Sequence, residues 1–197
     1  MILQIIGQVC WALRHPPGFL TSATGPIMFG LDGMNQAAYA AGQPIPNIIG
    51  MAFSYSMTIA VLYPAFALAV LIFSKSNQLK TVGKISIAPA FFGISEPLMF
   101  GVPVVMNPFM AIPWIISPTV NVLLGWLACS SGLVARYAGV TVFNFPMGVT
   151  GILNGSFTIA ILEVVVCIID VLIFMPFVRI QDKKYIDAEK AAETEQN

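Results

Sequence analysis

Charged side chains are scarce in this sequence and unevenly placed. Only 9% of the 197 residues are Asp, Glu, Lys or Arg, whereas 57% are apolar. A soluble domain has roughly 25% charged residues, so this composition excludes an ordinary soluble fold and indicates an all-α integral membrane protein. Half of the charged residues lie after Ile173, and the net charge is zero. Zero net charge gives no electrostatic reason to expect a nucleic-acid partner.

Several motifs of catalysis and metal binding are also missing from the sequence. Cys10, Cys129 and Cys167 lie in apolar surroundings, without the spacing of a disulfide framework or a metal site. The sequence has no glycine-rich phosphate loop, no cluster of metal ligands, and no nucleophile paired with a histidine base. We therefore expect no metal, no cofactor and no independent catalytic activity.

Long apolar runs predict membrane-spanning helices. Residues 47–73 contain no charge and are long enough to cross a bilayer, with a kink expected at Pro64. Residues 1–13 are too short to span and resemble the end of a longer helix. Further spans are predicted at 119–137 and 156–178. Segments rich in glycine and proline are predicted to be irregular, at 14–46, 85–118 and 138–155.

Two basic clusters predict the topology. One is Lys75, Lys80 and Lys84 in the predicted polar loop 74–84, and the other is Arg179, Lys183 and Lys184. The positive-inside rule places both on the cytoplasmic face, so an even number of crossings separates them. This requires residues 85–118 to be re-entrant or to cross twice, and favours a proline-broken re-entrant hairpin. We divide the chain into a membrane part, 1–180, and a charged cytoplasmic tail, 181–197, expected to be disordered beyond Tyr185.

Glu96 is the only charged residue between Lys84 and Arg136, in a stretch that proline interrupts repeatedly. Those prolines prevent one continuous helix, and irregular backbone at membrane depth is tolerated only under protein or along a wet cavity. Pro97 disfavours a helical conformation at Glu96. The carboxylate then either meets a polar ligand or a proton, or caps the N-terminus of a half-helix.

His15, the only histidine, lies at a break in a membrane helix, between Arg14 and Pro16. A lone histidine is more often structural. However, an imidazole can donate or accept hydrogen bonds near neutral pH, so His15 is a second candidate for ligand binding.

Four further polar residues have structural interpretations. Glu163 and Asp170 lie seven residues apart and therefore share one helix face. They form either a relay or, as we favour, an interhelical polar contact. Asp32 and Asn35 are expected to cap a short helix that follows them.

One long segment resembles a known family. Residues 83–113, GKISIAPAFFGISEPLMFGVPVVMNPFMAIP, resemble the signature of the membrane-embedded enzyme IIC component of the bacterial phosphotransferase system, in its lactose/cellobiose/chitobiose branch. The core SEPLMFGVPVVMNP, residues 95–108, differs notably from the family pattern only at Ser95, where Asn is usual. WALRHPPG (11–18) and MPFVRIQDKKY (175–185) are similar to a helix break and a closing segment of that family. The resemblance covers about the C-terminal half of a typical member.

The resemblance implies a disaccharide site among two re-entrant hairpins. It also implies that the sugar passes to a phosphocysteine on cytosolic enzyme IIB, which phosphorylates the sugar 6-hydroxyl. Glu96 and His15 would hydrogen-bond the sugar near that hydroxyl, and Glu96 would orient or deprotonate it. Trp11, Asn107 and Asn144 complete the implied substrate-binding set.

Asn144 differs from the family pattern, because a sugar-stacking Trp is expected at that position. Phe143 and Phe145, on either side of Asn144, are alternative stacking faces.

The sequence therefore predicts a permease component of a phosphoenolpyruvate-dependent sugar phosphotransferase system, incomplete on its own. It would be a multi-pass protein of the bacterial inner membrane with a cytoplasmic C-terminus. Its expected partners are a cellobiose-, lactose- or chitobiose-type disaccharide, phosphorylated enzyme IIB, the lipid bilayer, and a homologous N-terminal half or dimer partner. Two alternatives remain open: a proton-coupled secondary transporter that uses Glu96 and His15, and an inactive truncated remnant.

Overall fold

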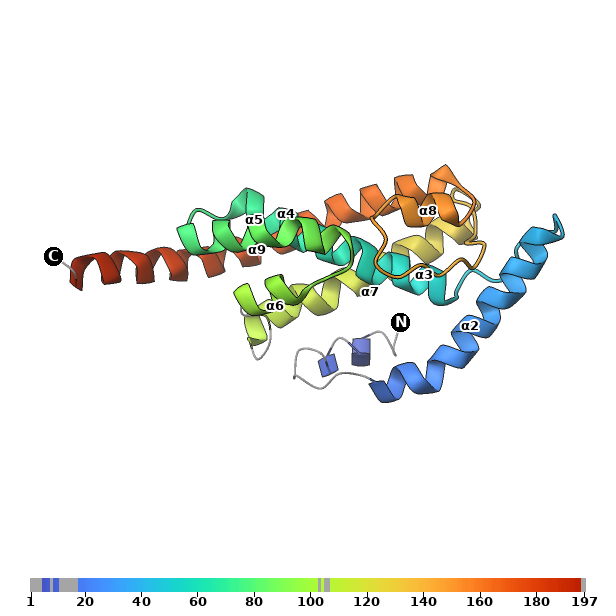
Figure 1. The fold of residues 1–197 in the computed structure, drawn as a ribbon, viewed down its shortest axis with the longest axis horizontal. Coiled ribbons are helices and arrows are strands. Elements are labelled where there is room, and N and C mark those ends of the chain that lie inside the picture. Colours follow the sequence, from blue (N-terminus) through green and yellow to red (C-terminus); the bar gives the residue numbers. More distant parts are fainter. Residues whose placement is uncertain (1–4, 8, 11–17, 103, 105–106, 196–197) are drawn as a thin grey trace.

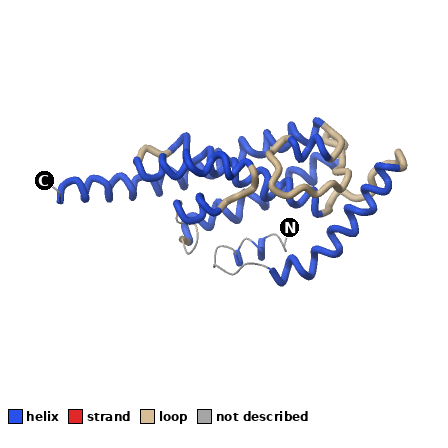
Figure 2. Tube along the Cα trace, viewed as in Figure 1, coloured by secondary structure: helices blue, strands red, loops and turns tan. Residues whose placement is uncertain are grey.

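The computed structural model describes residues 5–7, 9–10, 18–102, 104 and 107–195. All regular elements in that part of the chain are helices, which confirms the all-α prediction (Figures 1 and 2). From Gly18 onward, the helical segments are α2 (Gly18–Ala40), α3 (Met51–Tyr55), the π-helical turn η1 (Ser56–Ala60), α4 (Val61–Phe73), α5 (Asn77–Phe91), α6 (Glu96–Gly101), α7 (Pro108–Ser130), α8 (Val149–Leu153) and α9 (Phe157–Glu195).

Three segments among the described residues are long and apolar enough to cross a membrane. They are Met51–Phe73, which combines α3, η1 and α4, then Pro108–Ser130, which is α7, and Phe157–Ala191 in α9. The structure thus confirms a multi-span helical bundle. In the first segment the helix changes to a π-turn at Ser56–Ala60, just before Pro64. Pro64 has no N–H for the Ala60 carbonyl, so a local change in the hydrogen-bond ladder is expected there.

Helix α7 differs from the predicted span at 119–137. It begins at Pro108 and ends at Ser130, because proline is tolerated in the first turn and Asn107 caps that turn. Gly132 then adopts φ +77, a left-handed conformation that suits the end of a helix. Pro113 and Pro118 lie inside α7 without ending it.

Two other segments predicted as irregular or looped are helical. Helix α2 occupies most of 14–46, and α5 begins at Asn77, within the predicted loop 74–84. Ser76 caps α5, with its Oγ accepting a hydrogen bond from the Leu79 amide at 3.3 Å. Glycine and proline content misled the first prediction, and polar and lysine content misled the second. A backbone that avoids water must satisfy its own hydrogen bonds, and a helix does so locally.

Helix α9 runs along α4, and two buried apolar clusters lie between these helices and their neighbours (Figure 1). In one cluster the Phe66 ring contacts Trp114 and Phe174, at centroid distances of 5.9 and 4.7 Å. The other cluster packs Phe53 against Tyr137 edge to face, at 5.5 Å. These clusters fix α3, α4, α7 and α9 relative to one another, and so provide the frame for the loops described below.

The prediction of disorder beyond Tyr185 was wrong, because α9 continues to Glu195. Asp182 accepts hydrogen bonds from the Lys75 and Ser76 amides at 2.7 and 3.0 Å, and Glu189 accepts from the amides that follow. This part of α9 therefore packs against the start of α5. The two basic clusters consequently lie at the same end of the bundle, as the topology prediction requires.

Candidate functional site

Glu96 lies at the tip of the hairpin formed by α5 and α6. The chain leaves α5 through Gly93, whose φ of +73 is a left-handed conformation that glycine adopts without strain. Glu96 is then the first residue of α6, followed by Pro97 in the first turn. Its side chain is exposed. The carboxylate is thus available to a ligand.

Asn144 lies in the connection between α7 and α8. It adopts φ +58, a left-handed conformation that asparagine tolerates better than most residues. Its backbone amide donates a hydrogen bond to the Tyr55 hydroxyl at 2.8 Å. Phe143 and Phe145 on either side are 54% and 43% exposed, so this loop presents an amide between two aromatic faces.

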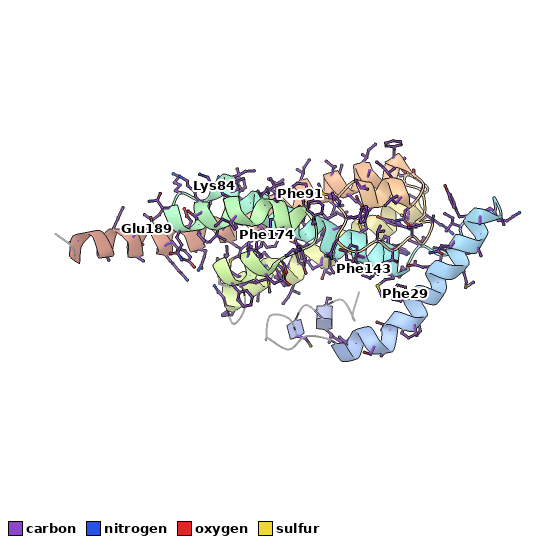
Figure 3. All side chains as sticks on the ribbon, viewed as in Figure 1. Phe29, Lys84, Phe91, Phe143, Phe174 and Glu189 are labelled. Carbon is purple, nitrogen blue, oxygen red and sulfur yellow. The ribbon has the colours of Figure 1, made fainter. Side chains whose placement is uncertain are left out.

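Tyr55 brings the hairpin and this connection together. A Cβ added to Gly93 would lie 2.9 Å from the Tyr55 hydroxyl and 3.5 Å from Asn144 Oδ1. The Phe143 ring, labelled in Figure 3, packs edge-on against Tyr55 at a centroid distance of 5.0 Å. Glycine is therefore required at position 93 for two reasons, the left-handed backbone conformation and the close approach of Tyr55. The loops that carry Glu96 and Asn144 meet at this point.

A second tyrosine lies on the other side of the π-turn. Tyr63 lies near Ser95 and Glu96 at the hairpin tip, without a hydrogen bond to either residue. Its ring stacks on Trp114 of α7 at 5.9 Å. Tyr55 and Tyr63 thus flank η1 and face the same hairpin, and π-turns are common at functional sites.

Asn107 has a structural contact in addition to its predicted role. Its Oδ1 accepts hydrogen bonds from the Phe109 and Met110 amides at 3.1 and 3.4 Å, which caps α7. The side-chain N–H₂ group is the part of Asn107 left to bind a ligand.

Trp11 and His15 lie outside the described residues. Their predicted places beside the sugar, and the pairing of His15 with Glu96, remain predictions.

Glu163 anchors the Asn144 connection from α9. Its side chain is 0% exposed. Oε1 accepts hydrogen bonds from Ser56 Oγ at 2.5 Å and Thr150 Oγ1 at 2.6 Å, and Oε2 accepts from the Gly148 amide at 2.6 Å. Ser56 adjoins Tyr55 in sequence, so this carboxylate links the helix that holds Tyr55 to the end of the loop.

Asp170 in turn accepts a hydrogen bond from Asn121 of α7 at 2.7 Å. Both residues make the interhelical contacts that we favoured.

Asp32 and Asn35 do not cap the helix that follows them, so that prediction was wrong. Both lie inside α2. Asp32 Oδ2 accepts hydrogen bonds from the Ala52 amide at 2.9 Å and from Thr141 Oγ1 at 2.8 Å. Asp32 therefore caps α3 and also fixes the start of the Asn144 connection. Asn35 binds the carbonyls of Asn47 and Tyr137 at 3.0 and 3.1 Å.

The assembled groups suit a polyhydroxylated ligand. A carboxylate accepts hydrogen bonds from hydroxyl groups, an asparagine amide both donates and accepts, and an aromatic face covers an apolar surface. Such a combination of an apolar wall and a few fixed polar groups is typical of small-molecule sites. Tyr55 and Gly93, which join the two loops, were missed at the level of the sequence. The glycine in AFFGISEP, placed directly before the hairpin tip, was the available signal.

Comparisons with known proteins connect this site to a family. Residues 15–118 match the family model described as phosphotransferase system, EIIC. The chain is 35% identical, over 93% of its length, to the oligo-beta-mannoside-specific EIIC component of Bacillus subtilis (strain 168), of which it covers 43%. It is 32% identical, over 98% of its length, to the cellobiose-specific EIIC component of Geobacillus stearothermophilus, of which it covers 45%.

A solved structure has the same fold. It is the transporter ChbC, the IIC component from the N,N'-diacetylchitobiose-specific phosphotransferase system. It matches 96% of this chain with a TM-score of 0.90 and 35% sequence identity, while the chain covers 45% of it. The chain thus spans less than half the length of each of these three proteins.

Proposed function

We infer a function from the fact that this chain belongs to the phosphotransferase system EIIC family, which confirms the resemblance seen in its sequence. EIIC proteins are integral membrane sugar permeases, and the described helices are long and apolar enough to span a membrane. We propose that this chain forms the sugar-binding half of such a permease. Its ligand would be a β-linked disaccharide, of the class named for its relatives of cellobiose, lactose and oligo-β-mannoside type.

The junction at Tyr55 is the observation that supports this proposal most strongly. It holds the exposed Glu96 carboxylate and the Asn144 loop on neighbouring segments. Phe143 then provides an aromatic face next to these polar groups. In this arrangement Glu96 and Asn144 hydrogen-bond sugar hydroxyls, and Phe143 covers an apolar face of a sugar ring.

Glu96 is the proposed catalytic residue. With a phosphocysteine of enzyme IIB as donor, a bond forms between phosphorus and the sugar 6-oxygen while the phosphorus–sulfur bond breaks. The Glu96 carboxylate orients the 6-hydroxyl and accepts its proton. Phosphoryl transfer depends mainly on positioning and charge stabilisation, so a membrane component that holds the acceptor in place is sufficient.

Trp11, His15 and Asn107 complete the proposed site. His15 would hydrogen-bond the sugar near the hydroxyl that is phosphorylated, and Trp11 would pack beside it. Asn107 would donate through its side-chain amide, because its oxygen caps α7.

A second polypeptide segment is part of the proposal, since the chain covers only 43–45% of three relatives. Helix α2 diverges from the bundle in Figure 1, and its apolar side chains Ile27 and Met34 are 66% and 57% exposed. A homologous N-terminal half, or a dimer partner, would cover this surface. The membrane would be the bacterial inner membrane, with the basic end of the bundle and the C-terminus in the cytoplasm.

Uptake driven by phosphoenolpyruvate tests this function. Cells that produce the chain together with a homologous N-terminal half are expected to accumulate phosphorylated cellobiose or a related β-disaccharide. Glu96→Gln should abolish this uptake, because an amide cannot accept the proton. Asp187→Asn, which neutralises an exposed carboxylate of α9, is the matched control and should transport normally.

Two outcomes would contradict the proposal. Absence of uptake with both polypeptides in the membrane would support the inactive remnant. Uptake that stops when the proton gradient is dissipated, while phosphoenolpyruvate is abundant, would support a proton-coupled transporter.

A further inference from the structure

A second buried carboxylate lies at the contact between α7 and α9, outside the proposed sugar site. Asp170 of α9 and Ser117 and Asn121 of α7 are each 0% exposed. Asn121 Nδ2 donates a hydrogen bond to Asp170 Oδ2 at 2.7 Å, and the Ser117 side chain lies close to the same carboxylate without a hydrogen bond to it. Three oxygens of this cluster nevertheless have no hydrogen-bond partner among the described residues: Asp170 Oδ1, Asn121 Oδ1 and Ser117 Oγ.

Glu163 lies two turns earlier on the same helix and differs from Asp170 in its hydrogen bonding. Both of its oxygens accept short hydrogen bonds, from Ser56, Thr150 and the Gly148 amide. Neutral donors therefore satisfy Glu163 completely. Asp170 receives one such bond, and the other unpartnered atoms beside it include an amide oxygen, which is itself an acceptor. Hydrogen-bond acceptors thus outnumber hydrogen-bond donors around Asp170.

No basic side chain from the adjoining spans can compensate the charge. Met51–Phe73 and Pro108–Ser130 contain no Lys, Arg or His. Helix α5 touches α9 and contributes Lys80 and Lys84, but both are exposed. Cys167, one turn before Asp170, is the nearest other titratable group on α9. An ionised carboxylate buried without a cation is strongly unfavourable.

The backbone of α7 offers one more acceptor on the same face. In a helix the carbonyl of Trp114 pairs with the amide four residues later, which here is Pro118 and has no N–H. Trp114, Ser117, Pro118 and Asn121 all belong to the buried face of α7. Asp170 therefore has several oxygen acceptors near it and no basic side chain from the adjoining spans.

We propose that Asp170, Asn121 and Ser117 form a buried site for one monovalent cation, taken up either as a proton on Asp170 or as Na⁺. A single carboxylate and neutral oxygens match one positive charge, and no group of three or more His, Cys, Asp or Glu among the described residues could hold a transition metal. A proton would let Asp170 donate to Ser117 and relieve the excess of acceptors. A sodium ion would be coordinated by the same oxygens. This site does not depend on the sugar-binding proposal.

Thermal unfolding of the purified chain in detergent tests the site. In one series Na⁺ replaces choline at constant ionic strength, and in the other the pH is lowered in sodium-free buffer. Binding to the folded state raises the melting temperature, by roughly 4 °C or more at a saturating ligand concentration. The wild type is expected to respond in one series, which identifies the cation. Asp170→Asn should lose that response, whereas Asp187→Asn should retain it.

Two further measurements use only the wild-type protein, so they do not depend on whether a variant folds. Binding of radiolabelled sodium, saturable and competed by unlabelled sodium, identifies Na⁺. The infrared carbonyl band of a protonated carboxylic acid at neutral pH identifies a proton. Equal profiles for the wild type and Asp170→Asn would overturn the proposal. So would the absence of both sodium binding and a carboxylic-acid band in the wild type.

Discussion

Tyr55 is the residue through which the two loops of the candidate site touch. Its hydroxyl accepts the Asn144 amide hydrogen bond, and its position leaves no room for a side chain at Gly93. Tyr55→Phe removes this acceptor while keeping the ring that packs on Phe143. We expect disaccharide affinity to fall about five- to tenfold, since a lost hydrogen bond is typically worth about 1 kcal/mol. Isothermal titration calorimetry measures this change.

The control for Tyr55→Phe is Tyr39→Phe, which alters an exposed phenol of α2. Tyr39→Phe should bind the sugar as the wild type does. Wild-type affinity in Tyr55→Phe would show that the junction does not position the loops.

Glu163 is a fully buried carboxylate of α9 that accepts three hydrogen bonds. Glu163→Ala leaves Ser56, Thr150 and the Gly148 amide without an acceptor in a buried place. We expect the free energy of unfolding to fall by about 2–3 kcal/mol. Glu163→Gln should lose less, because its amide oxygen still accepts.

Chemical denaturation in detergent measures both Glu163 variants. Val164→Ala, at the exposed neighbouring position, is the control and should change stability little. A stable Glu163→Ala variant would mean that these hydrogen bonds do not hold the Asn144 connection.

The sequence predicted individual polar residues better than their partners. Glu96 and Asn144 could both be proposed as site residues, because a charge within an apolar, proline-rich stretch and a departure from the family motif are local signals. Asp32 was expected to cap the helix that follows it, but it accepts a hydrogen bond from the first turn of α3 instead. Tyr55 was missed because its role depends on a residue 89 positions away. Long-range partners of this kind have no local pattern in a single sequence.

At the scale of elements, α9 and the start of α5 are joined by acidic side chains. Asp182 is 3% exposed and accepts hydrogen bonds from the Lys75 and Ser76 amides and from Ser76 Oγ. These bonds hold the residues just before the first turn of α5, and a carboxylate is favourable at a helix N-terminus. The end of α9 thus supports the helix that leads to the Glu96 hairpin.

Asp182→Ala should therefore loosen the start of α5. We expect amide hydrogen exchange at residues 75–80 to accelerate roughly tenfold, which corresponds to about 1.4 kcal/mol of local stability. Mass spectrometry of exchanged peptides measures this effect. Asp187→Ala, on the exposed side of α9, should leave it unchanged. Equal exchange in both variants would show that the contact does not stabilise α5.

The helical tail and the helical α2 and α5 show why element bounds differed from prediction. In water-soluble proteins, glycine, proline and charged residues are reliable signs of loops. In this chain Ser76 and Asp182 cap α5 from two directions, and the end of α9 consists largely of Ala, Glu and Lys, which favour helix. Composition indicated the all-α class, whereas the ends of helices depended on these contacts.

For the molecule as a whole, the exposed face of α2 is the surface expected to meet a second polypeptide. In a chain whose native cysteines are replaced by alanine, Ile27→Cys and Met34→Cys should react with a thiol reagent. Co-production of a homologous N-terminal half should protect both positions by about fivefold or more in rate, since burial excludes the reagent. Leu133→Cys, in the exposed turn after α7, should remain reactive. Equal reactivity at all three positions would exclude α2 from that interface.

The central claim is that the Glu96 hairpin and the Asn144 loop form one sugar site. A photoreactive β-disaccharide, crosslinked to the chain assembled with an N-terminal half and mapped by mass spectrometry, tests it most directly. Crosslinks are expected in both 93–98 and 143–145, and excess unmodified disaccharide should reduce them together. Competed crosslinks confined to other segments, with neither of these two labelled, would contradict it.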